Sequence, residues 1–420
     1  MVYLTPLFAT LPLFSSWVGG VPEVAPAFTA EIKKRAEGKE SSLLMMPSYV
    51  TIPRNHQISL HAPIYYALDV GGTNLRVLKI SFADGLDSPQ VIASHRCKIP
   101  QEIICSRSCS RLFDLLGQET AFFLKEMGDS DKELSLGFTF SFAFEQKSLD
   151  EASIVRWSKG FSFEDGIGKD PVAMFRAALK KYDVEKVKVA ALINDTTGTL
   201  LSRISLAEAD VGLIVGTGMN ICLLMPDEKN NEMIYVLEAG NFDMALTSLM
   251  TEYDIAVDES SENPGRHRAE KMISGKYLGK VVSAVLKEHA EKIEGDVEIT
   301  TPEVCAFTEI DDEVLMERCR EHNIIVEDLA TAQAVRGLCR NVVTRSAYIV
   351  AACLQASVAY IDPGSIREHV VVVDGALYNN PWYSARVREA FDVLEVKNIT
   401  LTPAQDGSGI GAAIAAAIAG

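Results

Sequence analysis

The residues best suited to chemistry lie on two neighbouring loops between positions 136 and 161. An apolar run leads into Phe140-Ser141-Phe142, and Trp157-Ser158-Lys159-Gly160-Phe161 follows shortly afterwards. These segments offer hydroxyl groups, one lysine and glycine-flanked backbone, which are groups that fix a small polar ligand in a pocket. We therefore expect a small polar molecule to bind where this strand ends.

Three carboxylates elsewhere in the chain are further candidates. Asp195 follows the apolar run Val187–Ile193, and it could accept the proton of an attacking hydroxyl, as a general base does in phosphoryl transfer. An Asn-Asp pair at this position also fits the start of a helix. Glu238 and Glu270 could bind several sugar hydroxyls, although Glu270 also fits a solvated helix face.

Three glycine-rich turns are candidate phosphate sites. Asp69–Asn74 and Gly216–Asn220 each lie between two apolar runs, and Asp406–Gly409 precedes a helix of small residues. Glycine lets backbone N–H groups approach phosphate, and a helix N-terminus favours it. Each segment alone also fits an ordinary turn or helix cap. Asp69 could hold Mg²⁺ through a water, and no direct metal ligand is expected. The residues expected to bind nucleotide are Asp69, Gly71, Gly72, Thr73, Asn74, Thr217, Gly218, Gly407 and Ser408.

The elements that must position these residues follow a repeated pattern. A strand, a Gly/Thr turn and a second strand occur at 64–82 and again at 211–225, which predicts two hairpins. Alternating strands and helices around them predict two α/β lobes related by duplication. Further strands are expected at Leu134–Phe140, Val187–Ile193 and Val370–Val373, helices at Arg111–Met127, Pro171–Tyr182, Ala269–Glu291, Asp311–Arg320, Glu327–Tyr360 and Ile410–Ala419, and a surface connection at Lys292–Ile310.

Composition limits the kind of partner. The chain has 420 residues, which is enough for two domains, and its net charge of −17 argues against nucleic acid while leaving a nucleotide possible. The eight cysteines are scattered without a His/Cys cluster. A zinc site is therefore not expected, and the cysteines are expected to be reduced thiols.

The N-terminal segment Val2–Gly20 is apolar and ends in small residues. It fits either a secretory signal cleaved near Gly20 or an irregular arm packed on the body, because it lacks Lys and Arg and contains two prolines. It is too short for a convincing membrane span, and no later stretch is better. Asn194 and Asn398 both fit N-glycosylation acceptors, but a glycan on Asn194 would block the proposed site, which weighs against secretion.

Taken in order from about Pro22 to Ala419, these segments resemble the hexokinase family. The resemblance includes the 136–161 stretch, Met46–Val50, Glu270–Gly275, Asp374-Gly375 and Asp406–Gly409. It implies an α/β fold of the two-lobed actin-like ATPase (ribonuclease H-like) type, with duplicated mixed sheets flanked by helices. The expected small lobe is 64–200 with the helix 408–420, and the large lobe is 21–63 and 201–407, beside the arm 1–20. Closure around sugar and Mg·ATP would exclude water.

The resemblance also implies residue roles. Asp195 would take the proton from the sugar 6-hydroxyl, and Lys159 would bind the sugar and steady the transferring phosphoryl group. The expected sugar-binding residues are Ser141, Phe142, Ser158, Lys159, Asn194, Asp195, Asn220, Glu238 and Glu270. The implied partners are a hexose, ATP and Mg²⁺, in a cytoplasmic monomer or homodimer.

Several positions depart from the family's pattern around the sugar loops. Ala143 replaces a usual Pro, Ser158 a Thr, Val236 an Asn and Ala239 an aromatic residue. None of these removes a proposed catalytic group, so an ATP-dependent hexose kinase is expected. The small side chain of Ala239 leaves an N-acetylglucosamine kinase as one alternative, and a catalytically weak sugar sensor is another.

Overall fold

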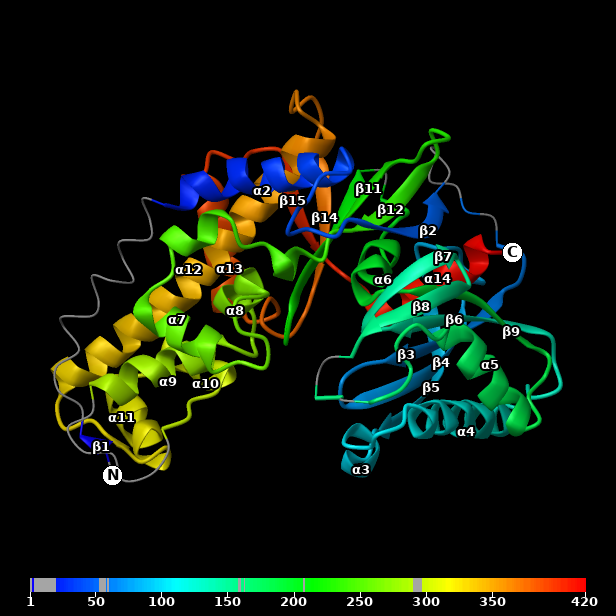
Figure 1. Ribbon diagram of the computed structural model, residues 1–420, viewed down its shortest axis with the longest axis horizontal. Coiled ribbons are helices and arrows are strands. Elements are labelled where there is room, and N and C mark those ends of the chain that lie inside the picture. The colour runs from blue at the N-terminus through cyan, green and yellow to red at the C-terminus, as the bar shows by residue number, and fades with distance from the viewer. Residues whose placement is uncertain are drawn as a thin grey trace.

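The computed structural model describes residues 2–3, 20–52, 58, 60–157, 160–161, 163–206, 208–289 and 297–420. Two mixed sheets, each with its own helices, make up most of it (Figure 1). Helices cover both sheets, and the prediction of an α/β fold is confirmed. Ser158 and Lys159 lie outside the described residues.

The five-stranded sheet runs in the order β5 (Gln90–Lys98), β4 (Asn74–Ser81), β3 (Ile64–Val70), β6 (Leu134–Phe140) and β9 (Val187–Ile193). β3 and β4 form the first predicted hairpin, and β6 and β9 run parallel to β3. On β3, Leu68 packs in the core shared with α4 (Ser110–Glu126) and α5 (Pro171–Lys181). The neighbouring Ala67 faces the core shared with α14 (Gly407–Ile418). This alternation of side chains covers both faces of the sheet with helices.

The six-stranded sheet has the order β15 (Ile399–Pro403), β14 (His369–Asp374), β10 (Ala209–Val215), β11 (Met219–Pro226), β12 (Glu232–Val236) and β2 (Met46–Ile52). β10 and β11 form the second predicted hairpin, and β14 runs parallel to β10. Two smaller pairs complete the strands: β7 (Ala143–Ser148) with β8 (Glu151–Arg156), and β1 (Val2–Tyr3) with β13 (Ile324–Ile325).

The larger group of helices packs beside the six-stranded sheet. It comprises α2 (Val21–Ala36), α7 (Glu252–Glu259), α8 (Arg268–Ile273), α9 (Leu278–Glu288), α10 (Thr301–Phe307), α11 (Asp312–Glu321), α12 (Leu329–Ile361) and α13 (Pro381–Val393). Short helices lie at α3 (Gln101–Ile104), η3 (Ala239–Asn241) and η4 (Ala245–Ser248). α12 has the length and apolar character of a membrane span, but most of its side chains are buried in the protein core.

Two predictions about this region are wrong. The helix expected at Ala269–Glu291 is two helices, because the N–H of Gly275 leaves the helix and donates to the carbonyl of Gly216 at 2.7 Å. The surface connection expected at Lys292–Ile310 contains α10, whose Val304 and Phe307 are buried. Residues 290–296, which span the boundary between these two predicted segments, lie outside the described residues.

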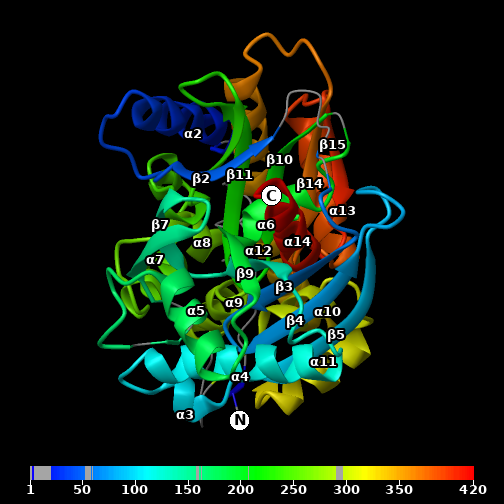
Figure 2. The same cartoon turned by 90° about the vertical axis from the view of Figure 1, so that its right-hand side faces the viewer.

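Two helices lie between the sheets. α6 (Asp195–Leu201) follows β9 and packs against β10, whereas α14 follows β15 and packs against β3, β6 and β9. Figure 2 shows α6 and α14 side by side. They approach closely through glycines: a Cβ on Gly411 would lie 2.1 Å from the carbonyl oxygen of Gly198. The lobe boundaries predicted from sequence stay predictions.

Candidate active site

The carboxyl ends of three adjacent parallel strands carry the first group of predicted residues. β3, β6 and β9 end at Val70, Phe140 and Ile193, so Ser141 and Asn194 meet at one edge of the sheet. The backbone N–H of Ser141 donates to the carbonyl of Val70 at 3.2 Å. The side chain of Ser141 is almost fully buried at this edge.

Asp195 opens helix α6 directly beyond this edge. Asn194 is the cap, since its Oδ1 accepts the backbone N–H of Thr196 at 2.8 Å, and Asp195 Oδ1 accepts the same N–H at 2.9 Å. The interpretation as a helix start and the interpretation as a site residue are therefore both compatible with the structure. Capping fixes where the Asp195 carboxylate lies at the sheet edge.

Glu238 and Asn220 reach the site from the other sheet. Asn220 Nδ2 donates to Glu238 Oε1 at 3.1 Å, and Asn220 Oδ1 accepts the N–H of Ala239 at 3.1 Å. Glu238 has a φ of +52°, a left-handed conformation that a side-chain-bearing residue adopts only when its surroundings hold it there. Burial raises the pKa of Glu238 to about 7, and the charges of Asp195 and Glu270 add to the rise. These three carboxylates are therefore electrostatic neighbours.

Glu270 completes this group from helix α8. A Cβ on Gly218 would lie 2.7 Å from Glu270 Oε2, and one on Gly240 would lie 3.3 Å from Glu270 Cβ. The two glycines leave the space that Glu270 occupies. Because Glu270 is half-buried and the residues on either side of it are buried, the solvated-face alternative is wrong for this helix.

Arg76 joins the first and third phosphate candidates. Its Nη2 donates to Asp69 Oδ2 at 2.8 Å and to Asp406 Oδ1 at 2.7 Å. Ser408 Oγ donates to Asp69 Oδ2 at 2.9 Å. The turn that contains Gly71 and Gly72 leaves Thr73 and Asn74 exposed, and its base is held against the start of α14, which begins at Gly407.

The second phosphate candidate faces the same region from β10 and β11. Gly216 N donates to the carbonyl of Gly218 at 2.9 Å, which forms a tight turn with Thr217 exposed at its tip. Asp374, at the end of β14, lies nearby: its Oδ2 would be 3.2 Å from a Cβ on Gly407. Burial raises the pKa of Asp374, and the charges of Asp406 and Asp195 contribute to the rise.

Arg76 and Asp374 were not among the predicted site residues. Arg76 lies directly opposite Asp69 in the β3–β4 register. Assigning the register of the predicted hairpin would therefore have been enough to predict this pair from the sequence. Asp374 ends a strand in the same way as Asp195, and the Asp374-Gly375 pair was noted only as part of the family resemblance. Its position beside Gly407 depends on a contact between distant parts of the chain.

Phe142 lies in an aromatic cluster under the sugar loop. Its ring centroid is 4.7 Å from that of Phe140, 5.3 Å from that of Trp157 and 5.1 Å from that of Phe161. Trp157 is the last described residue before 158 and 159, which are outside the described part. The predicted sugar contacts of Ser158 and Lys159 therefore stay predictions.

Among the described residues, the substituted position Val236 borders little empty space. Val236, Phe142, Asn194 and Glu238 line a cavity of only about 10 Å³, which is no larger than one water requires. Ala239 is fully buried. The described residues therefore leave little room at Val236 for a larger sugar substituent.

Two mixed sheets flanked by helices, with carboxylates and glycine-rich turns between them, define the class of two-lobed sugar kinases with the actin-like ATPase fold. Sequence profiles described as hexokinase match residues 18–205 and 210–418. Hexokinase-2 of Solanum tuberosum is 34% identical over 95% of this chain and 88% of its own length. The hexokinase of Schistosoma mansoni is 33% identical over 91% of this chain and 90% of its own length.

A solved structure agrees with these matches. The Schistosoma mansoni hexokinase complexed with glucose has a TM-score of 0.84 and 30% identity, and the alignment covers 98% of each chain. A second hexokinase crystal structure has a TM-score of 0.77 at 27% identity. This chain belongs to the hexokinase family. The predicted family and fold are confirmed, the protein is an ATP-dependent hexose kinase, and neither alternative function is favoured.

Proposed function

We propose that the protein transfers the γ-phosphoryl group of Mg·ATP to the 6-hydroxyl of glucose. The observation that carries this proposal is the convergence of Asp195, Glu238 and Glu270, which come from three separate segments, around one position. The glucose complex of the similar Schistosoma mansoni hexokinase supports glucose as the sugar. Carboxylates and the amide of Asn220 suit a ligand with several hydroxyl groups.

Each group has one task in the proposed reaction. Asp195 accepts the proton of the 6-hydroxyl as that oxygen attacks the γ-phosphorus and the bond to the ADP oxygen breaks. Glu238 and Glu270 bind the remaining hydroxyls. Because the pKa of Glu238 is about 7, its carboxyl group can donate as well as accept near neutral pH. Lys159 steadies the charge on the transferred group.

The nucleotide's phosphates are assigned to the turns at 71–74 and 216–218 and to the start of α14, where free N–H groups and the helix dipole favour anions. Among the described residues, no group of three or more His, Cys, Asp or Glu side chains could hold a metal ion by itself. Mg²⁺ is proposed to arrive with ATP, with Asp69 and Asp374 meeting its waters. Bound Mg²⁺ would neutralise charge on the phosphates.

A coupled ADP-release assay over a panel of sugars tests the proposal. We expect kcat/KM for glucose to exceed that for N-acetylglucosamine by at least tenfold. A preference for N-acetylglucosamine would overturn the choice of sugar. ADP release that does not depend on any hexose would overturn the proposed reaction.

We further propose that the protein is cytoplasmic and retains residues 1–20. The support is the pairing of Val2 with Ile324 and of Tyr3 with Ile325 in β1 and β13, which cleavage near Gly20 would remove. N-terminal sequencing of the protein from its native source tests this, and a mature chain that starts near residue 21 would contradict it. Light scattering would distinguish the monomer from the homodimer.

A further inference from the structure

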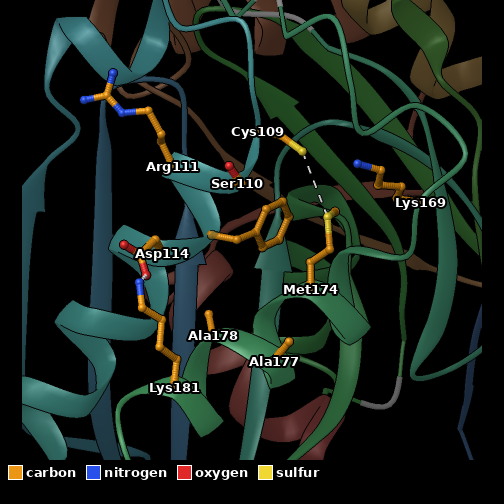
Figure 3. Close-up of a pocket in the computed structure, with 10 residues that line it drawn as sticks. Cys109, Ser110, Arg111, Asp114, Lys169, Met174, Ala177, Ala178 and Lys181 are labelled. Carbon is orange, nitrogen blue, oxygen red and sulfur yellow. Dashed lines mark hydrogen bonds and ion pairs between the residues drawn. The ribbon is translucent and has the colours of Figure 1, made fainter.

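A second cavity lies on the outer face of the five-stranded sheet, between helices α4 and α5 (Figure 3). Its volume is about 440 Å³, which is within the range of small-molecule sites. Phe113, Met174 and Ala178 contribute apolar side chains to its lining, and Arg111, Lys169 and Lys181 contribute charged ones. None of these residues belongs to the active site.

The charges around this cavity are only partly balanced. Lys181 is 2.5 Å from Asp114, and Lys169 is 3.4 Å from Asp165. Arg111 Nη1 donates to the backbone carbonyl of Glu102 at 3.2 Å. This acceptor is uncharged, so it does not balance the positive charge of Arg111. Within the described residues no carboxylate forms an ion pair with Arg111. The cavity therefore carries one uncompensated positive charge on a protein whose net charge is −17, and it favours an anion with an apolar body.

The cavity wall is connected to the sugar loop. Cys109, which lines the cavity, donates its backbone N–H to Asp165 Oδ1 at 2.7 Å. Trp157 Nε1 donates to the carbonyl of Asp165 at 3.2 Å. A Cβ on Gly166 would lie 2.8 Å from Cys109 Sγ and 2.9 Å from the Trp157 ring. Because these contacts are close-packed, a shift of the wall would be expected to move Trp157, which immediately precedes Ser158 and Lys159 in the sequence.

We propose that the α4–α5 cavity binds a small organic anion with an aromatic or alkyl body, and that its binding changes sugar affinity through Trp157. The apolar body lies on Phe113 and Met174, and the anionic group pairs with Arg111. The second half of this inference rests on the proposed function, because it requires the 157–161 loop to contact sugar. The first half stands independently.

Titration calorimetry with naphthalene-1-sulfonate tests the first half. Sulfate supplies the charge alone, and 1-naphthol supplies the ring alone. We expect the sulfonate to bind at least tenfold more tightly than either. Ala177→Trp fills the cavity from an exposed position and should abolish binding, while Arg111→Gln should weaken it at least tenfold. Arg107→Gln is the matched control, since the side chain of Arg107 is 87% exposed, pairs with Glu164 and does not line the cavity.

Binding that survives Ala177→Trp, or that is equally tight for 1-naphthol, would overturn the site. An unchanged melting temperature confirms that each variant is folded. For the second half, glucose affinity is measured by calorimetry with and without saturating naphthalene-1-sulfonate. We expect at least a threefold change in the wild type and none in Ala177→Trp, with glucose changing probe affinity by the same factor. An unchanged glucose affinity would overturn the coupling, whereas absence of any glucose binding would instead contradict the proposed function.

Discussion

Arg76 on β4 and Asp406 at the start of α14 are joined by two hydrogen bonds, of 2.7 and 3.2 Å, although 330 positions separate them in the sequence. Asp69 shares the same guanidinium group. The first phosphate turn and the start of α14 are thereby held as one unit. Arg76 contributes to their spacing together with the hydrogen bond from Ser408 to Asp69, and its side chain does not itself have to contact the nucleotide.

Replacing Arg76 should therefore affect ATP more than sugar. In Arg76→Met, Asp69 and Asp406 lose their shared cation, which costs about 3 kcal/mol of folding free energy when a largely buried pair is broken. We expect the KM for ATP to rise at least tenfold and the KM for glucose to change less than threefold. Arg96→Met is the control, because Arg96 is exposed and directly opposite Arg76 on β5. Equal effects on both KM values would contradict the positioning role.

Removal of the proposed base should separate binding from turnover. In Asp195→Ala we expect kcat to fall by roughly 10²–10⁴-fold, while glucose affinity measured by calorimetry changes little. Asp87→Ala, in an exposed turn, should match the wild type. If Asp195→Ala retained kcat within tenfold of the wild type, another residue would have to accept the proton.

Glu238 should make stability depend on pH. Its folded pKa of about 7 lies above that of an unfolded Glu. Ionising Glu238 therefore destabilises the folded state progressively as pH rises from about 4.5 to 7. Glu238→Gln removes this cost, so we expect its stability relative to the wild type to increase by roughly 2 kcal/mol between pH 5 and pH 8. Urea unfolding at both pH values measures the change.

The exposed Glu145→Gln is the control for that comparison, and it should show the same difference from the wild type at both pH values. A relative stability of Glu238→Gln that is unchanged between pH 5 and pH 8 would contradict a raised pKa at Glu238.

We expect Gly218 to affect sugar binding because it leaves room for the Glu270 side chain, and not because it affects folding. Gly218→Ala would place its Cβ 2.7 Å from Glu270 Oε2, and the end of that side chain can move aside at little cost in stability. We expect glucose affinity to fall at least tenfold with an unchanged melting temperature. In Gly216→Ala, the nearest atom to the new Cβ is 3.4 Å away, so glucose affinity should stay near that of the wild type.

Replacing Gly411, in contrast, should lower the stability of the folded protein. Gly411→Ala would place a Cβ 2.1 Å from the carbonyl of Gly198, and neither backbone can yield without separating α6 from α14. We expect a loss of at least about 1–3 kcal/mol in folding free energy, the usual cost of overpacking. Urea unfolding measures it. A midpoint equal to that of Gly216→Ala would show that the helices are less tightly packed than described.

Much of this site could be predicted because its residues end apolar runs. Asp69 and Asp195 each lie at or just beyond the end of a buried strand, and an abrupt change from apolar to polar residues is visible in one sequence. β5 was not predicted because none of its residues is buried, so it has no apolar pattern that marks a strand. The break between α8 and α9 was missed because it depends on Gly216, nearly sixty positions away.

The same limit applies to Arg76 and Asp374. Their partners, Asp406 and Gly407, are distant in sequence, so no local pattern marks the contacts. The residues alone mark Lys159 as a group that could bind a polar ligand, whereas its specific role towards the sugar and the transferred phosphoryl group depends on the family resemblance.

The glycine contact between α6 and α14 has a mechanical consequence. A Cβ on Gly198 would lie 2.8 Å from the carbonyl of Gly407 and 3.2 Å from the Cα of Ser408, so the first turns of both helices touch without interlocking side chains. Because backbone meets backbone there, no side-chain rotamer change can alter the spacing of the two helices. Asp195, the proposed proton acceptor, and Ser408, a proposed phosphate contact, are therefore expected to keep their separation whether or not the substrates are bound.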